Sequence, residues 1–196
     1  MIKSTKLLSI LKDILNKDNI QEKDLKEVKD ITLNKKLLNG KENDIDLTEL
    51  ELLPNLKTLT IINFYIDKKI IDIINKKKLL WAVQFTKCKF QTAEQINNDI
   101  KYLIVEQCEN FEPILINNNE IIRIIGENID LNLLKSNEAK QLYLQECNIK
   151  NSEKILEYRN LKYLNLDGSK IDKDIIEKIK EDIQISNKDK YYHLED

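Results

Sequence analysis

The sequence has few of the residues that build sharp turns and catalytic sites. Its 196 residues include three Gly, two Pro and one His. The glycines (Gly40, Gly126 and Gly168) are isolated, which excludes a glycine-rich phosphate loop. The one histidine, His193, lies in the C-terminal tail, where nothing predicts the fixed position that a catalytic base needs. We therefore expect a protein that is not an enzyme and that holds no cofactor.

Long apolar runs and an excess of one charge are missing too. No stretch approaches the roughly 18 apolar residues that span a bilayer, and the net charge is only −2. Near the N-terminus, Lys12 and Asp13 interrupt the apolar run after about five residues, which is too short for a secretory signal. These features predict a cytoplasmic protein that binds neither membranes nor nucleic acid.

The chain does have a hydrophobic content of 41%, rich in Ile and Leu, which suffices for the core of one domain. Apolar residues of segment 5–16 recur at helical spacing, and segment 21–28 predicts a second short helix. We expect residues 1–27 to form a helical N-terminal cap, because a stack of repeats needs a cover at its open end. Residues 187–196 are expected to form a C-terminal tail.

A repeat occupies the rest of the chain. Residues 139–149 (AKQLYLQECNI) carry apolar side chains at positions one, four, six, nine and eleven. The same template returns 22 residues later, at 161–171 (LKYLNLDGSKI), with Ser169 at position nine. This spacing is typical of stacked repeats, in which each unit buries its apolar face only against its neighbours.

Further copies of the template cover residues 28–186. Their anchors are Val28, Ile31 and Leu33; Leu56, Leu59 and Ile61; Leu80, Val83 and Phe85; Ile100, Leu103 and Val105; Ile121, Ile124 and Gly126; and Ile183 with Ile185. Alternation around positions four and six predicts a short strand with these two side chains inward. The linking segments are expected to form short helices or irregular turns, with Ser152 and Asp172 as helix caps. The predicted fold is therefore an α/β solenoid built on a parallel sheet.

The pattern L-x-x-L-x-L-x-x-[N/C]-x-L resembles that of leucine-rich repeat proteins. The entry KDLKEVKDITL, followed by DLTELELLPNLKTLTI, is similar to bacterial internalins, whose repeats have about 22 residues. The resemblance implies a right-handed solenoid of about seven or eight repeats with its strands on the concave face. Unlike the secreted internalins, the sequence shows no signal peptide, and Phe, Cys, Ile or Ser replaces most of their position-nine asparagines. We therefore expect apolar packing, rather than an asparagine ladder, to hold the bend.

Cys88, Cys108 and Cys147 all fall on position nine and face the predicted interior. Buried free thiols are the favoured interpretation, because a buried Cys packs as a small apolar side chain. A Cys88–Cys108 disulfide is an alternative, since neighbouring turns lie roughly 4.8 Å apart. A metal site is disfavoured because the sequence has no Cys-x-x-Cys pair.

Positions three, five and seven face away from the core on the strand side. In repeats four to seven they gather aromatic, aliphatic and Arg side chains beside an acidic margin, which is typical of protein interfaces. The candidate partner-binding residues are Tyr102, Ile104, Glu106, Arg123, Ile125, Glu127, Gln141, Tyr143, Gln145, Tyr163, Asn165 and Asp167. The alternative is that such residues only favour strands. For Trp81, at position two, the sequence does not decide between a location at the strand edge and one under a loop.

We expect a non-catalytic module, monomeric when free, that binds another protein through its concave face. A sharper alternative is an immunity protein or antitoxin-type inhibitor of a toxin or enzyme. Another alternative is a structural solenoid that acts by self-association.

Overall fold

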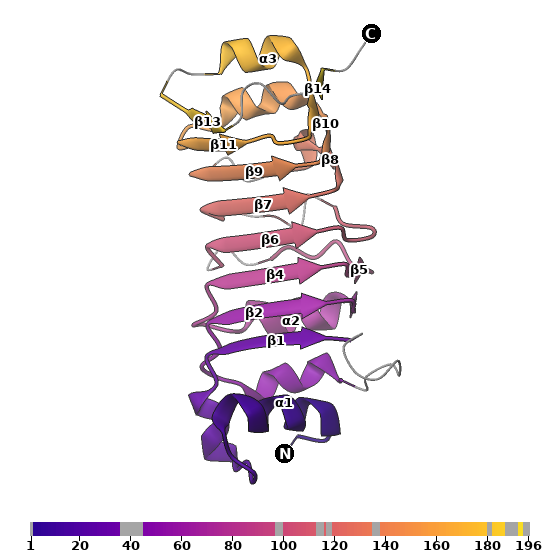
Figure 1. Cartoon of the computed structure of the whole chain (residues 1–196), viewed down its shortest axis with the longest axis vertical. Helices are drawn as coiled ribbons and strands as arrows, with labels where there is room; N and C mark the ends of the chain where they lie inside the picture. The colour runs from indigo at the N-terminus through magenta and orange to yellow at the C-terminus, as the bar shows by residue number, and fades with distance from the viewer. Residues whose placement is uncertain are drawn as a thin grey trace.

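The computed structural model describes residues 2–35, 45–96, 100–112, 116, 119–134, 138–179, 182–186 and 192–193. The chain forms a stack of parallel strands, with α1 at its N-terminal end and further helices behind the sheet (Figure 1). The eight strands of this sheet are β1 (Asp30–Asn34), β2 (Thr58–Ile62), β4 (Ala82–Thr86), β6 (Tyr102–Glu106), β7 (Ile121–Ile125), β9 (Gln141–Gln145), β11 (Tyr163–Asn165) and β13 (Gln184–Ser186). They follow one another in this order across the sheet, so each repeat adds one strand.

Side chains alternate between the core and the outer face along the strands. In β2, β4, β6, β7 and β9 the second and fourth residues are buried and the other three are partly exposed. This is the period of two that a pleated strand imposes. Leu142 and Leu144, the anchors of β9, are fully buried. The predicted solenoid with a parallel sheet is confirmed.

The N-terminal end of the stack is helical. α1 (Thr5–Leu15) begins after Ser4, whose hydroxyl accepts a hydrogen bond from the Leu7 N–H at 3.1 Å. Such a cap satisfies one of the N–H groups that the first helical turn leaves unpaired. Leu7 and Leu11 are fully buried, and the 3₁₀ helix η1 (Glu22–Glu27) follows. The helix thus adds two apolar side chains to the core at the open end of the stack.

The links between strands contain short helices. These are η2 (Leu47–Leu52), α2 (Lys68–Asn75), η4 (Leu131–Leu133), η5 (Ser152–Glu157) and α3 (Lys173–Lys178). Asp172 caps α3 as predicted, because its carboxylate accepts the Asp174 N–H at 3.0 Å. The predicted cap Ser152 is wrong. It is the buried first residue of η5, and Asn151 precedes it with a left-handed backbone that asparagine tolerates well.

Two smaller parallel sheets form where the chain turns away from the main sheet. One contains β8 (Asn128–Asp130), β10 (Asn148–Lys150), β12 (Lys170–Ile171) and β14 (Tyr192–His193), and the other pairs β3 (Tyr65–Ile66) with β5 (Lys89–Phe90). The expected tail therefore contributes a strand, in which His193 pairs with Ile171. Inside the turns, Phe90 packs edge-to-face on Phe85 and Phe111, with ring centroids 5.2 and 5.6 Å apart.

The structure corrects the register predicted for the fifth repeat. β7 aligns Ile122 with Leu142 and Ile124 with Leu144. Positions four and six are therefore Ile122 and Ile124, not Ile124 and Gly126. Both registers put the same face inward, and apolar spacing starts the template at Ile121 because the actual position one is the polar Asn119.

The last strand is also shifted from its prediction. Ile185 pairs with Leu164 and so takes position four rather than six. Gln184 and Ser186 accordingly stand at positions three and five.

Position eight has one backbone conformation in the second to seventh repeats. Its residues have φ between 50° and 72°, in the left-handed region: Asn63, Lys87, Gln107, Gly126, Glu146 and Gly168. At Gly126, an added Cβ would lie 3.2 Å from Cγ of Gln107, so the site is both left-handed and tightly packed. This conformation ends each strand and turns the chain.

Position nine holds the turns together by hydrogen bonds. The N–H of Cys88 donates to Sγ of Cys108 at 3.4 Å, and the N–H of Cys147 donates to the hydroxyl of Ser169 at 2.9 Å. Between them, the N–H of Cys108 donates to the carboxylate of Glu127. We call this chain of bonds the position-nine ladder. The expectation that apolar packing alone holds the bend is therefore wrong.

The three thiols are buried and free of disulfides. They also donate: Sγ of Cys88 to the carbonyl of Ile61 at 3.3 Å, and Sγ of Cys147 to that of Ile124 at 3.5 Å. Burial raises the pKa of the Cys147 thiol to about 11. Small polar side chains thus satisfy backbone groups that the tight turn leaves unpaired.

Candidate protein-binding face

The outer sheet face consists of the side chains at positions three, five and seven. On β6, β7, β9 and β11 it carries Tyr102, Ile104, Glu106, Ile121, Arg123, Ile125, Gln141, Tyr143, Gln145, Tyr163 and Asn165. The strand register brings Ile104, Arg123, Tyr143 and Asn165 into one row across the four strands. All except Asn165 are partly exposed. We call the cluster of Tyr102, Ile104, Ile121, Arg123, Ile125, Tyr143 and Tyr163 the aromatic patch.

Arg123 stands in the middle row of this patch, between Ile104 and Tyr143. Its Nε–H donates to Oε1 of Gln145 at 3.1 Å. Gln145 is neutral, and the ion pairs found in the described part of the chain do not include Arg123. Within the described residues, the guanidinium charge is therefore held in a fixed position without a carboxylate to neutralise it.

Two tyrosines pack against each other beside this charge. The rings of Tyr143 and Tyr163 have centroids 5.1 Å apart at 42°, and the hydroxyl of Tyr143 donates to Oε1 of Gln141 at 3.0 Å. Burial raises the pKa of Tyr143, nearby Tyr163 and Tyr102 add to the rise, and Arg123 opposes it. The pair is ordered by its own contacts, which leaves little side-chain freedom to lose when a partner binds.

Two predicted residues lie differently from the expectation. Glu127 occupies position nine and joins the ladder, so it does not stand on the outer sheet face. Asn165 is only 8% exposed, and its Oδ1 accepts the Asp167 N–H at 2.9 Å within a local turn. The acidic margin therefore consists of Glu106, Glu146 and Asp167, at the ends of the strands.

Ile121 belongs to the aromatic patch but was absent from the predicted set. The two-residue register shift places it beside Tyr102 and Gln141 at position three. Gly126 could have revealed the shift, since position eight needs a left-handed backbone and glycine adopts it without strain.

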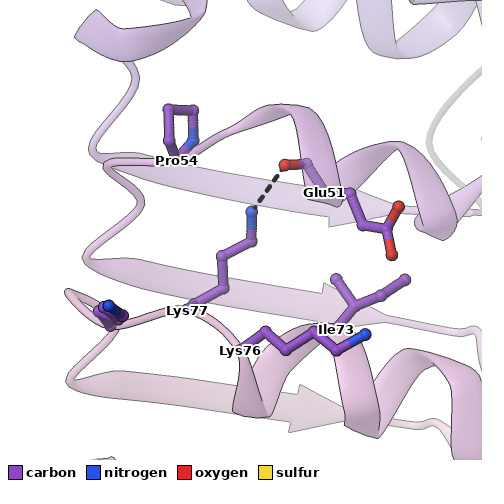
Figure 2. Close-up of a pocket in the computed structure, with 6 residues that line it drawn as sticks. Glu51, Pro54, Ile73, Lys76 and Lys77 are labelled. Carbon is purple, nitrogen blue, oxygen red and sulfur yellow. Dashed lines mark hydrogen bonds between the residues drawn. The ribbon is translucent and has the colours of Figure 1, made fainter.

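The structure also has hollows away from this face. One of about 350 Å³ lies between η2 and α2, lined by Glu51, Pro54, Ile73, Lys76, Lys77 and Lys78 (Figure 2). Figure 2 shows Lys77 reaching back to η2, where its ammonium donates to the carbonyl of Glu51 at 3.1 Å. The ammonium also donates to the carbonyl of Leu53 at 2.9 Å. Burial lowers the pKa of Lys77. This lysine ties two links together, which accounts for its position without a ligand.

Other kinds of site find no support in the described part of the chain. It contains no group of three or more His, Cys, Asp or Glu side chains arranged to hold a metal ion. Within the same residues, no helix has the length and apolar character needed to cross a membrane.

Comparison with solved structures identifies the fold. The structure of internalin C2 from Listeria monocytogenes matches over 97% of this chain and 93% of its own, with a TM-score of 0.54 and 11% sequence identity. The fold is the leucine-rich repeat solenoid. An internalin F structure from the same species matches 98% of this chain and 77% of its own at 11% identity, but its TM-score of 0.39 adds no argument. No protein-family model matches the sequence, and no curated protein matches it.

Proposed function

We propose that this leucine-rich repeat chain is a non-catalytic module that binds another protein through the aromatic patch. The proposal depends on one observation: Arg123, without an ion pair in the described residues, stands between Ile104 and Tyr143 on adjacent strands. Trp, Tyr and Arg are the residues that most often dominate interface energies. An apolar centre with a charged margin is the usual composition of such surfaces.

The scaffold supports this use because its shape is set before binding. Backbone hydrogen bonds run through eight aligned strands, and the aromatic patch lies on the fourth to seventh of them. Binding then costs little backbone entropy, so that more of the contact energy appears as affinity. The nearest alternative, that these residues serve only strand formation, does not account for an Arg in the centre of the row.

We place this activity in the cytoplasm, where the three free thiols fit a reducing compartment. A narrower form of the proposal is an inhibitor of the immunity or antitoxin type. The acidic margin of Glu106, Glu146 and Asp167 favours it, because such a margin complements a basic toxin surface. Self-association is the competing proposal, and light scattering of the purified chain distinguishes the two.

The test is capture of partners from a lysate of the cells that encode the chain. Wild type is compared with Arg123→Ala/Tyr143→Ala and with the control Arg159→Ala/Tyr65→Ala. The control removes the same residue types from exposed positions outside the patch. We expect the patch variant to lose about 2–4 kcal/mol of binding, and the control to bind as wild type. A partner that binds both variants like wild type would disprove the role of the patch.

A further inference from the structure

Position two forms a continuous row along the edge where the strands begin. Backbone bonds join neighbours: the N–H of Lys57 donates to the carbonyl of Lys29, that of Trp81 to Lys57 at 3.0 Å, and that of Lys101 to Trp81 at 2.9 Å. The same bonds continue toward the C-terminal end, where Lys162 donates to Lys140 at 2.9 Å. We call Lys29, Lys57, Trp81, Lys101, Glu120, Lys140 and Lys162 the strand-entry row. The repeat therefore assembles residues that are far apart in sequence.

Charge along this row is uneven. Glu120 pairs with Lys101 at 3.3 Å and with Lys140 at 2.9 Å, so these three side chains together keep one net positive charge. Lys29 and Lys57 have no ion pair among the described residues. The same holds for Lys162 at the other end of the row, but only the N-terminal pair, Lys29 and Lys57, lies next to Trp81.

Apolar side chains accompany this charge. Trp81 is 48% exposed and Leu79, two residues earlier, is 50% exposed. Both rank among the large apolar side chains that the structure leaves in water, and Trp is the residue most enriched at binding hot spots. The question left open by the sequence is settled: Trp81 stands at the strand edge, not under a loop.

We propose that Trp81 and Leu79, flanked by Lys29, Lys57 and Lys101, bind an acidic protein segment that carries an apolar side chain. Neighbouring turns lie about 4.8 Å apart, so Lys29 to Lys101 spans about 14 Å. An extended segment of about five residues covers that length, with carboxylates on both sides of one apolar residue. This inference rests on the proposed function, since it names the chemistry of a second contact beside the aromatic patch.

A protein segment fits this edge better than a nucleic acid does. A phosphate backbone needs a continuous row of cations, whereas Glu120 interrupts this one. The opposite margin of the outer sheet face carries Glu106, Glu146 and Asp167, and the net charge is −2. Both features repel a polyanion but tolerate a short acidic peptide that ends before Glu120.

Trp81 allows a direct test because it is the only tryptophan in the chain. Its emission is followed while the purified full chain is titrated with a heptapeptide that has Leu at its centre and Asp or Glu elsewhere. Parallel titrations use the Asn/Gln form of this peptide and a short oligothymidylate. We expect a saturable emission change with half-saturation at or below about 1 mM for the acidic peptide alone.

Variants separate this site from the aromatic patch. Lys57→Gln/Lys101→Gln should weaken binding of the acidic peptide at least about fivefold, since each exposed charge contributes modestly to the affinity. The control Lys150→Gln/Lys170→Gln removes exposed lysines of β10 and β12 and should bind as wild type. Arg123→Ala/Tyr143→Ala should also bind the peptide normally, so that failure of one site leaves the other testable.

Several outcomes would overturn the proposal. They are an unchanged Trp81 emission, equal binding of the Asn/Gln peptide, and normal binding by Lys57→Gln/Lys101→Gln. Oligothymidylate binding as tight as that of the acidic peptide would assign the edge to nucleic acid instead.

Discussion

Glu127 should make the stability of the solenoid depend on pH. Burial raises the pKa of Glu127 to about 7 from a usual value of 4.5, although the hydrogen bond from the Cys108 N–H opposes the rise. Between these two values the folded state keeps a proton that the unfolded state releases. Stability therefore falls as pH rises through this range, because the folded state binds more protons. The contribution is complete below pH 4.5 and lost above about pH 7.

The neighbouring turns explain why the neutral form fits. Cys108, Cys147 and Ser169, at position nine, donate to the position-six carbonyl of the preceding turn: Phe85, Ile124 and Leu144 respectively. The equivalent carbonyl for Glu127 belongs to Val105. Only a protonated carboxyl has a hydrogen to donate there. An ionised Glu127 has no hydrogen to donate and cannot make the bond that its neighbours make.

The size of the effect follows from the two pKa values. Their difference corresponds to at most about 3 kcal/mol between acidic and alkaline conditions. Glu127 is partly exposed, and solvent screening reduces this to about 1–2 kcal/mol. Such a change is a substantial part of the 5–15 kcal/mol that typically stabilises a domain.

The assay compares wild type with Glu127→Gln by urea unfolding at several values between pH 5 and pH 8.5. An amide accepts the Cys108 N–H and donates at every pH, so the variant should match wild type near pH 5 and exceed it by about 1–2 kcal/mol at pH 8. Glu177→Gln, at an exposed position of α3, serves as the control and should follow wild type throughout. A stability difference between Glu127→Gln and wild type that stays constant with pH would refute the reasoning.

Four further predictions follow from the packing. Leu144→Asp places an unpaired charge at a fully buried position and should unfold the chain, as judged by loss of cooperative thermal unfolding. Gly126→Ala should cost about 1–2 kcal/mol of stability in urea, because alanine is strained at φ +72° and crowds Gln107; a neutral result would contradict the assigned turn. Lys87→Gly, at the same position of another repeat, should be neutral or stabilising by up to about 1 kcal/mol. The three thiols should react with a disulfide reagent only after unfolding, and rapid labelling of the native chain would contradict their burial.

The architecture could be predicted because most repeats have the same spacing of apolar residues. In the copy at 139–149, for example, Leu142, Leu144 and Cys147 alternate with polar residues, and only one register buries all of them. Where the fifth repeat departs from this pattern, the register was lost. Its position one is Asn119, which is buried and donates to the carbonyl of Ile100, and its position nine is Glu127. A search for apolar anchors does not detect polar residues at positions one and nine.

The position-nine ladder could not be predicted for a related reason. Its bonds join residues about twenty positions apart, and each partner is chosen by the register of neighbouring turns rather than by local sequence. The Cys108 thiol and the Ser169 hydroxyl each accept one N–H and donate to one carbonyl, and the Glu127 carboxyl accepts one N–H. The residue type therefore does not predict these hydrogen bonds, whereas the shared position in the turn does.

The corrected register changes the candidate site more than the fold. A shift of two residues leaves the stack parallel, but it moves Arg123 from position three to the central row, between Ile104 and Tyr143. It also removes Glu127, the nearest predicted acid, from the outer sheet face. Because an Arg between an aliphatic and an aromatic side chain is typical of binding hot spots, the shift strengthens the proposal that this face binds a protein. The same logic separates the two classes of position: substitutions at four, six and nine should change stability, and those at two, three and five should change partners.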